Sequence, residues 1–271
     1  MACEPELPPV GKSTIPLRSG LLGLLTSAAL LWPGQVLAQV EDANAILKSM
    51  SDYLAGQKTI AASFNSSTEV LTTDLQIIQF NSSVEMLLSR PDKLRASRRG
   101  GYADVEMIFD GTSLTFNEKS NKTYTTLPAS GTFSQLVDRL RSEVGLEVPA
   151  GDLLLDDVYA ALSADVLDAK YIGEGVISGV DSHHLAFRNA DTDWQLWVEM
   201  GPNPAPRKLV ITSKTVTGAP QFTIEFTSWK TDVEIAADAF TFQAPVDSKK
   251  AELKDLSGLD EVPPGVVVGG N

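Results

Sequence analysis

The sequence is poor in the side chains that most often carry catalysis and metal binding. Its 271 residues contain one cysteine, Cys3, and two histidines, His183 and His184. A structural zinc site needs four ligands, mostly cysteine and histidine, and adjacent residues of a strand point to opposite faces of a sheet. The two histidines therefore cannot bind one metal ion from a single face, and we expect neither a metal nor another cofactor.

Basic side chains are also scarce. The chain has 22 Lys and Arg residues against 35 Asp and Glu residues, for a formal net charge of −13. Nucleic-acid binding depends on Lys and Arg side chains that contact phosphates. Adhesion to anionic lipid also depends on positively charged side chains. We therefore expect no nucleic-acid partner and no stable membrane insertion of the processed protein.

Common catalytic motifs are absent as well. The sequence has no G-x-S-x-G elbow, no P-loop and no dinucleotide-binding fingerprint. Asp191 and Asp193 could hold a calcium ion or act on a glycoside, but aspartates in turns more often bond to their own backbone. We expect a protein that is not an enzyme, and a hydrolase that uses His184 stays open as an alternative.

The N-terminal segment has the three-part pattern of a secretory signal peptide. Lys12 and Arg18 form a basic start, residues 21–31 are apolar, and residues 36–38 (VLA) form a small-residue cleavage site. The apolar run is shorter than the roughly 20 residues that span a bilayer. We predict cleavage between Ala38 and Gln39 and export to the periplasm. Cleavage removes Cys3, so the remaining chain can form no disulfide and has no lipid-anchor cysteine.

After the signal peptide the sequence predicts one mainly β domain over residues 39–250. Apolar residues at helical spacing predict a helix over 42–56, and two shorter helices over 134–144 and 152–162. Most of the remaining chain alternates apolar and polar residues with period two, with Asp110-Gly111 as a strong hairpin turn. Residues 251–271 lack a periodic face and are expected to form a disordered tail.

The predicted fold class is mainly β (α+β). We expect a strongly curved antiparallel sheet or incomplete β-barrel of about 10–11 strands with about three helices. The strands before the two short helices are predicted over 60–70, 78–88, 93–98, 105–109, 114–116 and 122–127. Those after them are predicted over 171–177, 183–189, 194–200, 208–214 and 221–229.

The inward face of this sheet is expected to be broad, apolar and rich in aromatic and methionine side chains. Such a face can form a packed core or line an adaptable ligand cavity, and the sequence leaves both open. The candidate cavity-lining residues are Phe64, Phe80, Met86, Met107, Phe109, Trp194, Leu196, Leu209, Phe222 and Ile224.

One short strand concentrates positive charge in this acidic protein. Lys93, Arg95, Arg98 and Arg99 lie within seven positions of each other. They could bind an acidic partner or a lipid headgroup at the cavity rim, or they could protect an exposed edge strand from aggregation. Both interpretations remain open at this point.

Several runs of sequence resemble known families. The first two runs below are similar to a strand and a hairpin of LolA/LolB-like lipoprotein carriers, and the set as a whole resembles the DUF2092 family of predicted periplasmic proteins over about residues 42–250. The runs are 90–95 (RPDKLR), 109–114 (FDGTSL), 153–155 (LLL), 183–188 (HHLAFR), 193–197 (DWQLW) and 206–212 (PRKLVIT).

The resemblance implies an incomplete barrel over helices with an apolar cavity that takes acyl chains. It favours a periplasmic, non-enzymatic carrier of a lipid, a lipoprotein or another apolar ligand, and we expect a monomer. The alternative is a structural or interaction protein of the envelope with a filled core, which docks a partner through its basic strand.

Overall fold

The computed structural model describes residues 42–146, 148, 150–256, 258, 259, 262, 263 and 266. The predicted signal peptide lies outside these residues. The first described element is helix α1 (Ala43–Ala55), which confirms the helix expected at 42–56. The side chain of Asp42 caps it by accepting the backbone N–H of Asn44 at 2.9 Å, as an N-cap residue does. One face of α1 is buried, and it carries Leu47, Met50 and Leu54.

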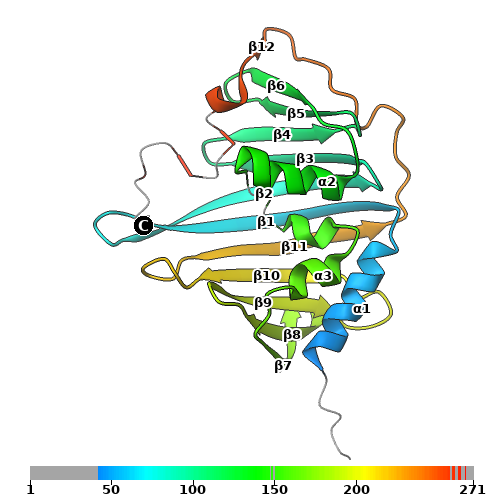
Figure 1. Cartoon of the computed structure of the whole chain (residues 1–271), viewed down its shortest axis with the longest axis vertical. Coiled ribbons are helices and arrows are strands. Elements are labelled where there is room, and N and C mark those ends of the chain that lie inside the picture. Colours follow the sequence, from blue (N-terminus) through cyan, green and yellow to red (C-terminus); the bar gives the residue numbers. More distant parts are fainter. Residues whose placement is uncertain are drawn as a thin grey trace, which may run out of the picture. The chain divides into compact units, whose positions relative to one another are not determined.

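The described strands form one sheet of twelve (Figure 1). The first meander consists of β1 (Thr59–Leu71), β2 (Ile77–Ser89), β3 (Lys93–Gly100), β4 (Asp104–Phe109), β5 (Ser113–Glu118) and β6 (Thr123–Pro128). The second consists of β7 (Asp168–Ile177), β8 (Val180–Arg188), β9 (Thr192–Glu199), β10 (Pro206–Ser213) and β11 (Gln221–Thr231).

The two meanders join where β1 pairs with β11, so the spatial order is β12-β6-β5-β4-β3-β2-β1-β11-β10-β9-β8-β7. Edge strands remain at both ends, and the sheet is an incomplete barrel. The predicted antiparallel meander is confirmed, with one strand more than expected. The additional strand, β12 (Lys249–Lys250), is short and pairs in parallel with β6.

The short helical elements lie between β6 and β7. They are α2 (Phe133–Arg139), a π-helical turn (Leu140–Val144), a 3-10 turn (Gly151–Leu154) and α3 (Val158–Ser163). A capping box starts α2, because Thr132 and Gln135 each bond to the backbone N–H of the other. Within the described residues, no helix has the length and apolar character needed to cross a membrane.

The inner face of the second meander is a packed core over β8, β9 and β10. Leu185, Leu196 and Leu209 pair in register across these strands, and each is at most 4% exposed. Helix α1 packs against β7, β8 and β9. Full burial of one such side chain contributes roughly 1.5–3 kcal/mol, so this half of the sheet supplies much of the stability of the domain.

Residues 251–271 are expected to form a disordered tail, but the described part of this segment contains a helical turn and buried side chains. Residues Leu253–Asp255 form a 3-10 turn, and Leu256 is only 5% exposed within the core cluster. Leu253 and Leu259 also pack against this cluster. Non-periodic apolar residues in this segment therefore find tertiary partners that a local pattern does not reveal.

The hairpin between β4 and β5 follows the Asp110-Gly111 signal. Gly111 has a φ of +91°, and a Cβ atom there would lie 2.7 Å from Oδ2 of Asp92. Oδ1 of Asp110 accepts the backbone N–H groups of Thr112 at 2.8 Å and Ser113 at 2.7 Å. Partial burial raises the pKa of Asp110, but these bonds and those from the two hydroxyl groups outweigh it and hold the pKa below its ordinary value.

This lowered pKa predicts a pH dependence of stability. Because the folded state favours ionised Asp110, its contribution is present above about pH 4 and is lost as the pH falls through the folded pKa. The Asp110→Asn variant should therefore lose less unfolding free energy than the wild type between about pH 5 and about pH 2.5, as measured by urea denaturation. Equal losses in the two proteins would contradict this account of the turn.

Candidate functional site

A cavity of about 770 Å³ lies against the inner face of the first meander. Strands β1–β5 and β11 form one wall. Another wall is formed by α2, by the 3-10 turn and by residues 145, 146, 148 and 150, which precede that turn. Its volume falls within the roughly 300–1,000 Å³ typical of small-molecule sites. The lining is mostly apolar, and its polar members are Ser66, Thr68 and Arg98.

Strand register explains why this wall is apolar and hollow. Met86, Ala96, Met107 and Phe116 are directly paired across β2, β3, β4 and β5, so their side chains share one face. All four line the cavity. The small side chain of Ala96 stands between two methionines, which leaves room at the centre of the row.

Five of the ten predicted cavity residues line this space. They come from four strands: β1 provides one, β2 one, β4 one and β11 two. They are Phe64, Met86, Met107, Phe222 and Ile224.

The other five predicted residues do not line the cavity. Trp194, Leu196 and Leu209 are buried in the core of the second meander, and Phe109 is fully buried at the end of β4. Phe80 is half-buried and lies opposite Thr68, beyond the lining residues of β2. The alternation of apolar and polar residues predicts one shared inner face for these five residues. It does not predict which part of that face is covered by helices.

The sequence patterns missed the parts of the lining that lie outside the strands. The wall opposite the strands includes Phe133 of α2, Leu146, and Leu153 and Leu154 of the 3-10 turn. The C-terminal part of the chain adds Leu259, Val262, Pro263 and Val266. The only signal for this segment is its apolar content, because its residues have no periodic pattern.

The four predicted basic residues do not form one cluster, because alternation splits them between the two faces of β3. Arg98 points to the inner face and lines the cavity. Its Nη2 donates to the backbone carbonyls of Gly258 at 2.7 Å and Leu259 at 2.9 Å. Lys93, Arg95 and Arg99 have the opposite parity and lie on the outer face.

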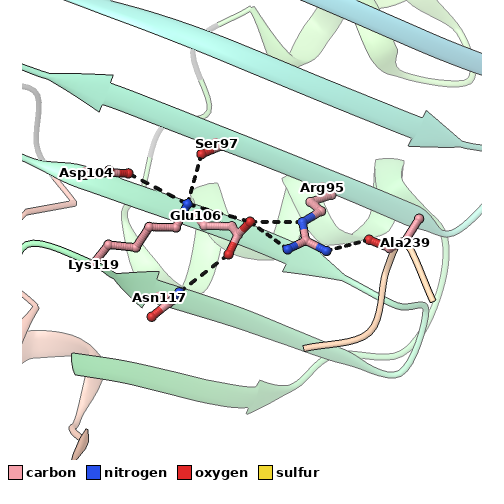
Figure 2. A network of polar contacts seen from close by, with 7 residues as sticks. All are labelled: Arg95, Ser97, Asp104, Glu106, Asn117, Lys119 and Ala239. Carbon is pink, nitrogen blue, oxygen red and sulfur yellow. Dashed lines mark hydrogen bonds and ion pairs between the residues drawn. The ribbon is translucent and has the colours of Figure 1, made fainter. Parts of the chain in front are cut away.

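Arg95 belongs to a polar network on the outer face (Figure 2). Its Nε donates to Oε1 of Glu106 at 2.9 Å, and its Nη1 donates to the carbonyl of Ala239 at 2.8 Å. Lys119 Nζ lies 3.9 Å from the same Glu106 oxygen, and Asn117 contacts Oε2 at 3.5 Å. Residues around Ala239 cover this face, so Arg95 serves an internal contact.

The two histidines also lie on opposite faces. His184 Nε2 is 2.9 Å from Oε1 of Gln195, and its ring stacks on Trp197 at 4.1 Å between centroids. His183 faces inward beside Val198, with Nδ1 3.4 Å from the hydroxyl of Tyr171.

Of the two aspartates near the start of β9, Asp193 is held by basic side chains, and the backbone carbonyl of Asp191 accepts the backbone N–H of Lys214 at 2.9 Å. Lys214 and Arg188 donate to Oδ1 of Asp193 at 3.1 Å and 3.3 Å. The hydrogen bond from Lys214, supported by Arg188, holds the pKa of Asp193 below its ordinary value. Within the part of the chain that the structure describes, no three His, Cys, Asp or Glu residues come together as a metal site.

Residues 43–254 match the family described as "Predicted periplasmic protein (DUF2092)". The chain belongs to this family. The match spans α1 to the 3-10 turn that follows β12, which is nearly the whole described domain, and it assigns the protein to the periplasm, as the sequence pattern predicted. No match was found among curated proteins.

Several solved structures are similar to this DUF2092 protein at low sequence identity. LprF from Mycobacterium bovis has a TM-score of 0.45 at 12% identity, covering 72% of this chain and 95% of that chain. An uncharacterised conserved protein from Thermus thermophilus has a TM-score of 0.44 at 9% identity, with coverage of 77% and 98%. Lipoprotein LppX from Mycobacterium tuberculosis has a TM-score of 0.43 at 12% identity, with coverage of 72% and 98%.

The outer-face network makes a prediction about stability. The side chain of Glu106 is 10% exposed, so Arg95→Ala leaves a buried carboxylate with only weaker, longer contacts. We expect Arg95→Ala to lower the unfolding free energy by about 1–3 kcal/mol, measured by urea denaturation.

The matched control is Arg99→Ala, on the same strand and the same face but exposed. It should stay within about 0.5 kcal/mol of the wild type. Equal effects of the two substitutions would show that the network around Glu106 does not hold this face together.

Proposed function

We propose that this DUF2092 protein is a non-enzymatic periplasmic carrier, active as a monomer, that holds an apolar ligand in the cavity of the first meander. The observation that carries the proposal is a cavity of about 770 Å³ whose lining is almost wholly apolar. Removing a ligand's methylene groups from water contributes about 0.8 kcal/mol for each group. An acyl chain of a lipid or lipoprotein is the ligand class that uses such a lining best.

The composition of the wall supports binding of flexible chains. Met86 and Met107 face the cavity from neighbouring positions of the sheet, and their unbranched thioether side chains adapt to ligands of different shape. Phe64, Phe226 and Trp229 add aromatic surface on the β1–β11 side.

The alternative with a filled core and a docking basic strand receives less support. Arg95 and Arg98, which would make the docking contact, both bond within the chain.

The chemistry of the lining supports carriage over catalysis. Among the described lining residues there is no histidine, aspartate, glutamate or lysine that could act as a general base. Of the four predicted basic residues, only Arg98 is in a position to meet the polar head of a bound ligand.

The proposal predicts saturable binding of a fluorescent fatty acid to delipidated protein. Ala96→Phe should fill the centre of the cavity, and Phe222→Glu should place a charge on its wall. Each should weaken binding by about tenfold or more, equivalent to at least about 1.4 kcal/mol. Leu75→Glu is the control, since Leu75 is 71% exposed and lies outside the lining, and its dissociation constant should equal that of the wild type.

Circular dichroism and urea denaturation of each variant separate loss of binding from loss of fold. The carrier function would be abandoned if folded wild-type protein bound no fatty acid and if mass spectrometry of organic extracts found no amphiphile on protein isolated from its own periplasm.

A further inference from the structure

The C-terminal segment covers part of the cavity with its own side chains. We define this segment by its described residues after β12: Leu253–Asp255, Leu256, Gly258, Leu259, Val262, Pro263 and Val266. Leu256 is buried in the core, which anchors the start of the segment. Beyond it, Leu259, Val262 and Val266 line the cavity, so the segment contributes apolar surface where an apolar ligand would also lie.

Polar groups fix the segment to two side chains of the β3–β4 region. Arg98 Nη2 donates to the carbonyls of Gly258 and Leu259 at 2.7 and 2.9 Å. The hydroxyl of half-buried Tyr102 donates to the carbonyl of Val262. The segment thus presents oxygen atoms to a guanidinium group and apolar side chains to the adjoining cavity.

A glycine allows this close approach. A Cβ atom on Gly258 would lie 2.6 Å from Oε1 of Glu118 and 3.1 Å from its Cδ. Glu118 is 2% exposed, and Asn121 and Thr123 hold its carboxylate at 2.7 and 3.1 Å. Because that carboxylate has little freedom to move, a methyl group on residue 258 would push the segment away from the sheet.

We propose that the C-terminal segment is an internal competitor, which occupies the position of the ligand's head and leaves when a ligand enters. This inference rests on the carrier function proposed above and specifies its ligand class: an acyl compound whose head carries anionic oxygens, either carboxylate or phosphate. The head takes the place of the two carbonyls on Arg98, and the chain takes the place of Leu259, Val262 and Val266.

The exchange favours an anionic head for a physical reason. The bonds from Arg98 to the backbone carbonyls join a charged donor to neutral acceptors. An ionised carboxylate or phosphate adds charge–charge attraction to such bonds and can accept two parallel N–H groups from the guanidinium. A carboxylate or phosphate therefore gains at Arg98 relative to the backbone carbonyls that it displaces, whereas an uncharged head does not. Apparent affinity also depends on the fraction of molecules in which the segment is released.

Two substitutions should loosen the segment without altering the cavity wall. Gly258→Ala introduces the clash with Glu118, and Tyr102→Phe removes the bond to Val262, and neither residue lines the cavity. Each should lower the apparent dissociation constant of a fluorescent fatty acid by about three- to tenfold, as expected when one interaction that holds the segment in the cavity is lost. Gly101→Ala is the matched control, because a Cβ there meets no atom within 4 Å, and it should leave the constant unchanged.

Displacement can be measured directly with one cysteine. The only natural cysteine is Cys3, so a Leu259→Cys protein that also carries Cys3→Ser has a single thiol on the segment. Saturating fatty acid should raise its alkylation rate about tenfold, because an occluded thiol becomes exposed. The same thiol at exposed Leu75 (Leu75→Cys) should react at a rate that the ligand does not change.

The head-group requirement is tested by probes of equal chain length. Arg98→Gln should weaken binding of a fatty carboxylate and of an alkyl phosphate by about tenfold, and it should not weaken binding of the uncharged alcohol. Comparison of the first two probes in the wild type shows which anionic head the protein prefers.

The outcomes distinguish this inference from the carrier function. If no probe binds to any folded variant, both the carrier function and the proposed role of the C-terminal segment are overturned. If the probes bind but the Leu259→Cys rate stays constant and Gly258→Ala does not tighten binding, the carrier stands and the internal competitor is overturned.

Discussion

The pairing of β1 with β11 is the contact on which the rest of the structure depends. It joins strands that are far apart in the sequence, with Ile60 opposite Thr231, and turns two local meanders into one sheet. The cavity lies along this junction, since Phe64 of β1 and Phe226 of β11 both line it. The rings of Phe64 and Phe226 are 5.3 Å apart, and Trp229 meets Phe226 edge-on at 5.3 Å. These aromatic contacts offset part of the entropy cost of closing so long a loop, and they give the cavity a rigid edge.

Both meanders consist of antiparallel strands, but different helical elements cover their inner faces. Helix α1 packs on β7, β8 and β9, and the inner side chains of β8 and β9 include Leu185, Leu196 and Val198, which are fully buried. The first meander faces α2 and the 3-10 turn, while α3 packs against α1, and the small side chain of Ala96 leaves space beneath these elements. One half of the sheet therefore stabilises the fold, while the other half can leave a space for a ligand.

The sequence predicts local features of this arrangement better than long-range ones. Alternation places Met86 and Met107 on one face, and the Asp110-Gly111 pair specifies its hairpin through bonds to the next two or three residues. The same alternation separates Arg95 from Arg98, which a view of them as a single basic cluster overlooks. Whether an inward side chain meets a helix or a cavity depends on packing that strand periodicity does not contain. The contact between Gly258 and Arg98 is still less predictable, because the two residues are 160 positions apart in the sequence.

The position of Arg98 constrains how any ligand can enter. A guanidinium group beside apolar walls is costly unless oxygen atoms accept its hydrogen bonds. In this structure backbone carbonyls of Gly258 and Leu259 meet that need. An apolar molecule that simply pushed the C-terminal segment aside would take these acceptors from Arg98 and supply none. A ligand with an oxygen-bearing head supplies new acceptors as it removes the old ones. In the exchange that we propose, the cost at Arg98 is small. The choice between closed and loaded states would then depend on how well the ligand's chain fills the apolar space between Met86, Met107 and Phe222.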